Sequence, residues 1–133
     1  MDPIEVAKRY LVTWDTTNAA DMPGHFIEGG TYTPSGEGPL TGQAIADYAD
    51  AVFKSMPDSR MPVHKIFADG NNVCAEWTYS ATMTNDFGPF KATGKSFELV
   101  GCHVIEVQGD KIKSVVSRWD RLDMLIQLGL FGS

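Results

Sequence analysis

The spacing of apolar residues changes near Met61, and this change constrains the fold more than any other feature of the sequence. Before it, apolar side chains recur every three to four positions, and after it they alternate with polar ones. The first spacing is typical of amphipathic helices and the second of half-buried strands. The sequence therefore predicts one α+β domain over residues 1–133, with helices first and a mostly antiparallel sheet after them.

The N-terminal half predicts two amphipathic helices. Asp2 and Pro3 form a typical helix start, because an acceptor side chain caps the first turn and proline needs no hydrogen-bond partner there. The helix that they begin should end by Asn18. Thr41 is predicted to cap the second helix, which ends before Pro57. Between the helices we expect a helical turn over 20–26, a short strand over 31–33 and a loop over 34–39.

The C-terminal half predicts a meander of strands and one short helix. Apolar and polar residues alternate over 63–67, 73–83, 96–107 and 112–119. Turn-forming residues separate these strands, including Asp69-Gly70-Asn71-Asn72 and Gln108-Gly109-Asp110. A final helix over 122–128 stops at Gly129, which suits the left-handed conformation that follows many helices.

The alternation also predicts which side chains face the helices. On the strand over 96–107, the odd positions should line the helix-covered face, His103 among them. On the last strand, the same parity turns Arg118 and Asp120 inward, together with Ile112, Ser114 and Val116. A one-residue β-bulge in that strand would reverse the prediction for Arg118 and Asp120.

The opposite face of the sheet is half apolar, and we expect it to form a homodimer contact. Large contiguous apolar patches on a protein surface often mark the contact with another protein chain. The apolar residues expected on this outer face are Val100, Cys102, Val104, Val115 and Trp119.

Charge and cysteine content exclude several classes of function. The formal net charge is −6 without a Lys/Arg cluster, which argues against nucleic-acid and anionic-membrane partners. Cys74 and Cys102 lack metal-ligand spacing, so we expect reduced thiols and no metal. No apolar run is long enough to span a membrane and residues 1–5 do not begin a signal peptide, so a cytoplasmic location is expected. Nucleotide-binding motifs are missing as well, and we expect no cofactor.

The concave face is predicted to hold a site for a hydrophobic small molecule. Such sites combine an apolar lining with a few convergent polar groups, here His103, Arg118 and Asp120. Each has a structural alternative, because Asp120 could only cap the last helix and His103 could be a hydrogen-bonded core residue. The aromatic residues expected to stack on a flat ligand, or only to fill the core, are Trp14, Phe53, Trp77 and Tyr79. Tyr32 is expected to donate a hydrogen bond into the pocket or only to anchor its loop.

The layout resembles the nuclear transport factor 2-like superfamily over nearly the whole chain. The capped first helix, the Tyr32-x-Pro34-x-Gly36 loop, Gly42 before the next helix and the strand meander carry this resemblance. The ending from Gly109-Asp110-Lys111-Ile112 through Trp119-Asp120 to Gln127-Leu128-Gly129-Leu130 resembles the SnoaL-like polyketide cyclases. The resemblance implies a cone-shaped fold in which helices and a curved sheet enclose an apolar pocket. It does not select one activity, because the superfamily includes isomerases, cyclases, dehydratases, epoxide hydrolases and proteins without catalysis.

The resemblance also implies roles for particular residues. In SnoaL-like cyclases an aspartate that closes the last strand is the acid/base and a histidine on the preceding strand faces it; Asp120 and His103 occupy similar places. Thr33 replaces the aspartate base of ketosteroid isomerases, and Trp77-Thr78-Tyr79 replaces the Arg-x-Asp pair of limonene epoxide hydrolases. Many relatives carry tyrosine at the position of Arg118, whose guanidinium would keep a neighbouring carboxylate ionised or polarise a substrate carbonyl.

These observations favour a cofactor-free enzyme. Asp120, with His103, would transfer a proton at the carbon next to a carbonyl of a hydrophobic substrate, including polycyclic substrates. The reaction would be an aldol-type cyclisation, an isomerisation or a dehydration. Two alternatives stay open, a non-catalytic small-molecule-binding or dimerisation module and an atypical epoxide hydrolase. The epoxide hydrolase would need a further carboxylate in the pocket, which the inward-facing strand positions do not offer.

Overall fold

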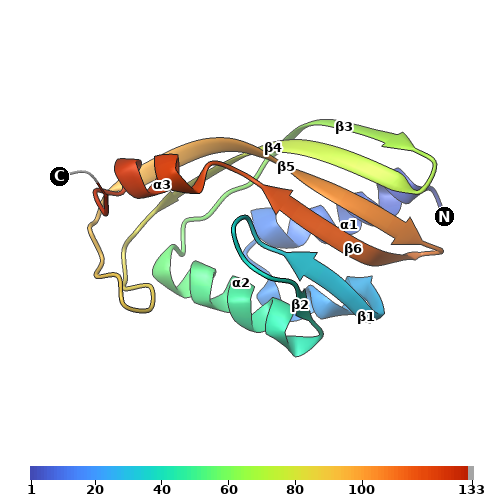
Figure 1. The fold of residues 1–133 in the computed structure, drawn as a ribbon, viewed down its shortest axis with the longest axis horizontal. Coiled ribbons are helices and arrows are strands. Elements are labelled where there is room, and N and C mark those ends of the chain that lie inside the picture. Colours follow the sequence, from blue (N-terminus) through green and yellow to red (C-terminus); the bar gives the residue numbers. More distant parts are fainter. Residues whose placement is uncertain (132–133) are drawn as a thin grey trace.

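Helices pack against one face of a six-stranded sheet in the computed structural model, which describes residues 1–131 (Figure 1). The helices are α1 (Pro3–Asp15), α2 (Gln43–Ser55) and α3 (Arg121–Gln127), with 3-10 turns at Ala19–Asp21 and Pro23–His25. The strands are β1 (Phe26–Thr33), β2 (Leu40–Thr41), β3 (Val63–Asp69), β4 (Asn72–Thr82), β5 (Ser96–Gln108) and β6 (Lys111–Arg118). They lie in the order β2-β1-β6-β5-β4-β3; β1 and β6 run parallel, and the other neighbours run antiparallel. The predicted α+β plan is confirmed.

The first helix begins and buries its apolar face as predicted. The Ile4 amide donates a hydrogen bond to Asp2 Oδ1 at 2.9 Å, and Pro3 occupies the first turn. Burial of a large apolar side chain contributes about 1.5–3 kcal/mol, so packing on the sheet stabilises α1 more than its intrinsic helix propensity does. The apolar side chains that α1 buries are Val6, Ala7, Tyr10, Leu11 and Trp14. No helix within residues 1–131 has the length and hydropathy needed to cross a membrane.

Two boundaries in the N-terminal half differ from the sequence prediction. β1 begins at Phe26, inside the segment predicted as a helical turn. Gly42, at φ 55°, is the N-cap of α2, whereas Thr41 belongs to β2 and pairs with Thr31 of β1. At Phe26 the pairing with Ile112 of β6 overrides the local signal, and at Thr41 the pairing with β1 does so.

A β-bulge interrupts β6 near its start. Glu106 of β5 is paired with Ser114 of β6, and the next residue, Val107, is paired with Ile112. Lys113 therefore has no partner on β5. An unpaired residue of this kind shifts the alternation of side chains by one position.

The bulge corrects the predicted orientation of the last strand. Val115 and Ser117 are buried, Trp119 is half-buried, and Arg118 and Asp120 are exposed. The prediction that Arg118 and Asp120 face inward is therefore wrong, as is the placement of Val115 and Trp119 on the outer face. The residues that the prediction wrongly turned inward are Ser114, Val116, Arg118 and Asp120.

The parity of β5 is as predicted. Its odd positions are turned toward the helices, and His103 is 1% exposed. Val100 and Val104, on the opposite face, are 62% and 45% exposed. The buried apolar residues of β5 are Phe97, Leu99, Ile105 and Val107.

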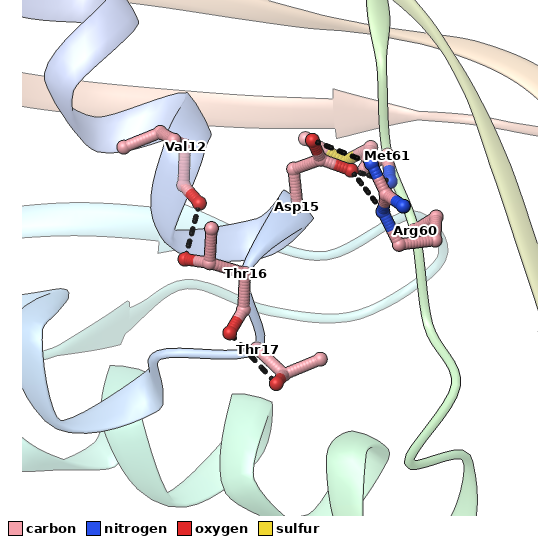
Figure 2. A network of polar contacts seen from close by, with 6 residues as sticks. All are labelled: Val12, Asp15, Thr16, Thr17, Arg60 and Met61. Carbon is pink, nitrogen blue, oxygen red and sulfur yellow. Dashed lines mark hydrogen bonds and ion pairs between the residues drawn. The ribbon is translucent and has the colours of Figure 1, made fainter.

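An ion-paired contact joins the end of α1 to the segment before β3 (Figure 2). Asp15 Oδ1 accepts hydrogen bonds from Arg60 Nε at 3.0 Å and from the Met61 amide at 2.8 Å. The hydrogen bond from Arg60, assisted by that from Met61, holds the pKa of Asp15 below its usual range. In the following turn the Thr16 hydroxyl donates to the Val12 carbonyl at 2.7 Å. The contact fixes the backbone of Met61, whose side chain is buried.

Gly101 on β5 allows the Trp77 ring to lie against the sheet. A Cβ at this position would lie 2.5 Å from Trp77 Cη2 and 2.7 Å from the Arg118 carbonyl oxygen. We expect Gly101→Ala to lower the free energy of unfolding, measured by urea denaturation, by about 1–3 kcal/mol, as overpacked cores do. Gly24→Ala is the control, because a Cβ there meets nothing within 4 Å. Equal losses in both variants would contradict this close packing.

Candidate functional site

An apolar cavity of about 150 Å³ lies inside the fold. Its walls come from the inner faces of β4, β5 and β6, from α1 and α2, and from the C-terminal segment that contains α3. The loop between β4 and β5 adds Phe87 and Phe90 near the opening, and Phe90 is 39% exposed. Met56, Met61 and Met83 supply further apolar surface. The predicted pocket therefore exists on the predicted face.

The structure separates the predicted site residues into two groups. Phe53 is buried behind Trp14, with ring centroids 5.5 Å apart, and does not line the cavity. Arg118 and Asp120 point away from it because of the bulge. The predicted residues that do line the cavity are Trp14, Tyr32, Trp77, Tyr79 and His103.

His103 lies in the cavity wall, with four aromatic rings around it. The centroid of its imidazole is 5.4 Å from that of Trp77, 5.8 Å from Tyr10, 6.0 Å from Tyr32 and 6.3 Å from Trp14. Burial lowers the pKa of His103 to about 3, because these rings do not replace the hydration that an imidazolium needs. The imidazole is therefore neutral near pH 7, where it can donate or accept a hydrogen bond.

Three polar atoms in the cavity wall are buried without a hydrogen-bond partner within residues 1–131. They are Trp77 Nε1, Tyr79 Oη and His103 Nδ1. The Ser59 hydroxyl lies near Tyr79 Oη but without hydrogen-bond geometry. Each such atom costs about 1–3 kcal/mol when it is left unpaired, so their occurrence in one cavity calls for a functional explanation. They can supply hydrogen bonds to a polar group on an otherwise apolar ligand.

Apart from two charged side chains at the opening, the remaining polar groups of the wall are neutral. Trp14 Nε1 donates to the Tyr10 hydroxyl at 2.8 Å, so Trp14 offers the cavity only its ring. Burial raises the pKa of the Tyr32, Tyr48 and Tyr79 phenols, which stay protonated near pH 7. Within residues 1–131, no group of three or more His, Cys, Asp or Glu side chains is placed to hold a metal ion.

Two charged side chains line the opening, and the sequence analysis did not identify either. Glu37 lies in the loop after β1, and Arg121 is the first residue of α3; both are exposed. A Cβ at Gly36 would lie 3.0 Å from Arg121 Nη1, so the guanidinium rests against this loop. Glu37 is the one carboxylate among the described residues of the cavity wall. Its sequence context, between two turn glycines, indicates only a loop.

Asp120 caps the final helix. Its Oδ1 accepts a hydrogen bond from the Asp123 amide at 2.9 Å, and its side chain is exposed. This is the structural alternative that the sequence left open. The geometry gives the predicted acid/base role of Asp120 no support, because the carboxylate lies outside the cavity wall.

We expect His103→Gln to reduce the loss of stability in acid. Since the pKa is about 3 in the folded state and 6.5 in the unfolded state, the unfolded chain binds more protons between these values. The free energy of unfolding therefore decreases as the pH falls through this window. Between pH 7 and pH 5, the loss measured by urea denaturation should be about 2 kcal/mol larger in the wild type than in the variant. Equal losses would contradict a buried neutral His103.

Solved structures share this fold at low sequence identity. A protein with a ketosteroid isomerase-like fold from Catenulispora acidiphila, in complex with trimethylamine, superposes with a TM-score of 0.82 at 19% identity, over 96% of this chain and 94% of that one. IdmH from Streptomyces antibioticus, a candidate polyketide cyclase, superposes with a TM-score of 0.81 at 17% identity, over 97% of this chain and 99% of that one. An NTF2-like protein from Burkholderia thailandensis gives 0.79 at 19% identity, over 96% of each chain.

The sequence itself matches a family description. Comparison with curated protein sequences gives no significant match. The family model for the SnoaL-like polyketide cyclases, in contrast, matches residues 4–128. This match includes every helix and strand except the first residue of α1. With its NTF2-like fold and a family match over nearly all of its length, the chain belongs to the SnoaL-like polyketide cyclase family.

Proposed function

We propose that this protein is a cofactor-free enzyme that binds a hydrophobic, carbonyl-bearing small molecule and promotes its cyclisation or isomerisation through an enol or enolate. The observation that carries the proposal is the set of three unpartnered polar atoms, on Trp77, Tyr79 and His103, in an otherwise apolar cavity. Membership in the SnoaL-like polyketide cyclase family supports cyclisation as the first reaction to test.

The part of the cavity wall that these three residues form fits a carbonyl oxygen. An indole N–H, a phenol O–H and one tautomer of a neutral imidazole all donate hydrogen bonds. Such bonds strengthen as the oxygen gains negative charge in an enolate, and they do so most in a cavity that excludes water. His103 acts here as a neutral donor, because the low pKa of its imidazole makes it a weak base.

Glu37 is the residue that we propose as the base in place of Asp120. Its carboxylate would take the proton from the carbon next to the carbonyl. In cyclisation, the resulting enolate carbon forms a bond to a second carbonyl carbon, whose oxygen receives the proton. In isomerisation, the proton returns to a different carbon. Arg121 and the Tyr48 phenol are close enough to Glu37 to share an electrostatic environment with it at the opening.

The volume of the cavity bears on the substrate. A cavity of about 150 Å³ encloses a molecule of roughly the size of benzene. One ring would therefore be enclosed between Trp14, Trp77 and His103, and the rest of a larger substrate would extend toward Glu37 and Phe90 at the opening. This arrangement places the carbonyl oxygen at the three donor atoms, and the neighbouring carbon on the side of the ring that faces the opening and Glu37.

A non-catalytic binding module is the second candidate. The observation that favours it is the exposure of Glu37, because neighbouring groups hold an exposed carboxylate less firmly in one orientation than a buried one. Under this alternative the same three polar atoms would orient a ligand without proton transfer. The two candidates differ in whether the α-hydrogen of a bound ketone exchanges with solvent.

The test of catalysis is exchange of the α-hydrogens of a bicyclic aryl ketone such as tetralone in D2O, followed by NMR. We expect the wild-type protein to accelerate exchange relative to buffer, and Glu37→Gln to lower this rate by about 10²–10⁴-fold, the usual contribution of a general base. Asp120→Asn is the matched control and should keep the rate, since asparagine also caps helices. A full rate in Glu37→Gln, or its loss only in Asp120→Asn, would refute this assignment.

Tyr79→Phe tests the polar recognition separately from catalysis. The affinity for tetralone, measured by quenching of tryptophan fluorescence, should fall by about two- to tenfold, while the affinity for the hydrocarbon tetralin should not change. The free energy of unfolding should stay equal or rise, because the variant removes a buried hydroxyl that has no partner. A clear loss of stability would show that Tyr79 Oη serves the fold instead.

A further inference from the structure

Arg121 is the only Lys or Arg side chain among the described residues of the cavity wall. Its Nη1 and Cδ atoms lie 3.0 Å and 3.5 Å from the position that a Cβ at Gly36 would occupy, so the side chain packs on the loop between β1 and β2. The Ser35 hydroxyl donates to the Trp119 carbonyl at 2.9 Å and joins this loop to the segment that carries Arg121. The place of the guanidinium at the opening is therefore built into the fold.

Neither charged side chain at the opening is paired within the part of the chain that the structure describes. None of the ion pairs formed by residues 1–131 includes Arg121 or Glu37. The neighbouring Asp120 carboxylate accepts a hydrogen bond from the Asp123 amide at 2.9 Å. The rest of this side of the wall is apolar, with Leu125 of the same helix in it. The guanidinium can therefore bind a group on a ligand.

Tyr48 adds a neutral hydrogen-bond donor to the opening. Burial raises the pKa of its phenol most, the charge of Glu37 raises it further, and the charge of Arg121 lowers it. The phenol thus stays protonated near pH 7, and it lies close enough to both charged groups to respond to them. Its hydroxyl can donate a hydrogen bond beside the guanidinium.

We propose that Arg121, together with the Tyr48 hydroxyl, binds a carboxylate of the ligand, so that the ligand of this site is a hydrophobic keto acid. A guanidinium binds a carboxylate through two parallel hydrogen bonds, and the phenol can donate a further one. The ketone oxygen would lie at Trp77, Tyr79 and His103 while the carboxylate stays at the opening. The inference rests on the ketone site of the proposed function, but not on catalysis.

The charges around the opening favour a carboxylate over a phosphate. Glu37 lines the same opening, and the chain has a formal net charge of −6. These negative charges repel a phosphate, with its charge near −2, more strongly than a carboxylate with a single charge. The planar guanidinium also matches the planar carboxylate. A single acidic group is therefore the anion that this opening accepts best.

The first experiment compares a tetralone that carries a propanoate chain with its primary amide, which has nearly the same shape and no charge. Dissociation constants for the full chain are measured near pH 7 by quenching of tryptophan fluorescence. We expect the acid to bind about three- to thirtyfold more tightly than the amide. Raising NaCl from about 50 to about 500 mM should reduce this preference. Equal affinities, or a preference that salt leaves unchanged, would overturn the proposal.

Three variants assign the preference to the opening. Arg121→Gln should abolish the preference for the acid and leave the affinity for the amide unchanged. Arg118→Gln is the matched control, because Arg118 is also exposed but lies on the outer face of the sheet, and it should keep the preference. Glu37→Gln should increase the preference by about two- to fivefold, since it removes a like charge from the opening. Circular dichroism checks the fold of each variant. A preference that survives Arg121→Gln, or that Arg118→Gln abolishes equally, would refute the carboxylate site.

Hydrogen exchange separates this proposal from the proposed catalysis. If the acid is preferred through Arg121 while the α-hydrogens of the bound ketone exchange no faster than in buffer, the carboxylate site stands and the catalysis is wrong. If exchange of tetralone is accelerated while the acid is not preferred, the catalysis stands and the carboxylate site is wrong.

Discussion

One unpaired residue in β6 determines how both faces of the sheet are used. Because Lys113 has no partner on β5, the residues after it exchange faces, and the side chains of Ser117 and Trp119 turn into the cavity. The same shift turns Arg118 to the outer face of the sheet and leaves Asp120 at the start of α3. Without this bulge, the cavity would contain a guanidinium and a carboxylate, and the outer face would be more apolar.

The cavity combines a stable scaffold with polar atoms that do not contribute to stability. Trp14 and Tyr10 satisfy each other's polar atoms through one hydrogen bond, as expected for a core. Trp77, Tyr79 and His103 do not, and the cost of their unpaired atoms must be offset by the surrounding apolar burial. A site of this kind gains its hydrogen bonds when a ligand arrives, which makes those bonds available for recognition. The low pKa of His103 follows from the same lack of polar neighbours.

The walls of the cavity depend on contacts that lie outside it. Gly101 leaves room for the Trp77 ring, and the hydrogen bonds from Met61 and Arg60 to Asp15 fix the segment that carries the Met61 side chain into the wall. These contacts join α1 to β3 and β4 to β5, so they also hold the sheet against the helices. The shape of the cavity is thus a consequence of how the core is assembled.

The sequence by itself determined the fold class, the order of the elements and the family. Apolar residues spaced every three to four positions in helices, and at alternate positions in strands, are local properties of the chain. The sequence also identified His103, since the parity of β5 is uninterrupted, and the aromatic lining residues Trp14, Tyr32, Trp77 and Tyr79. Only the tertiary structure decided the orientation of Arg118 and Asp120, because a bulge arises from pairing with another strand and leaves no local signal. It alone brought Glu37 and Arg121 to the opening, since a loop and a helix start that are distant in sequence meet only when the sheet has formed.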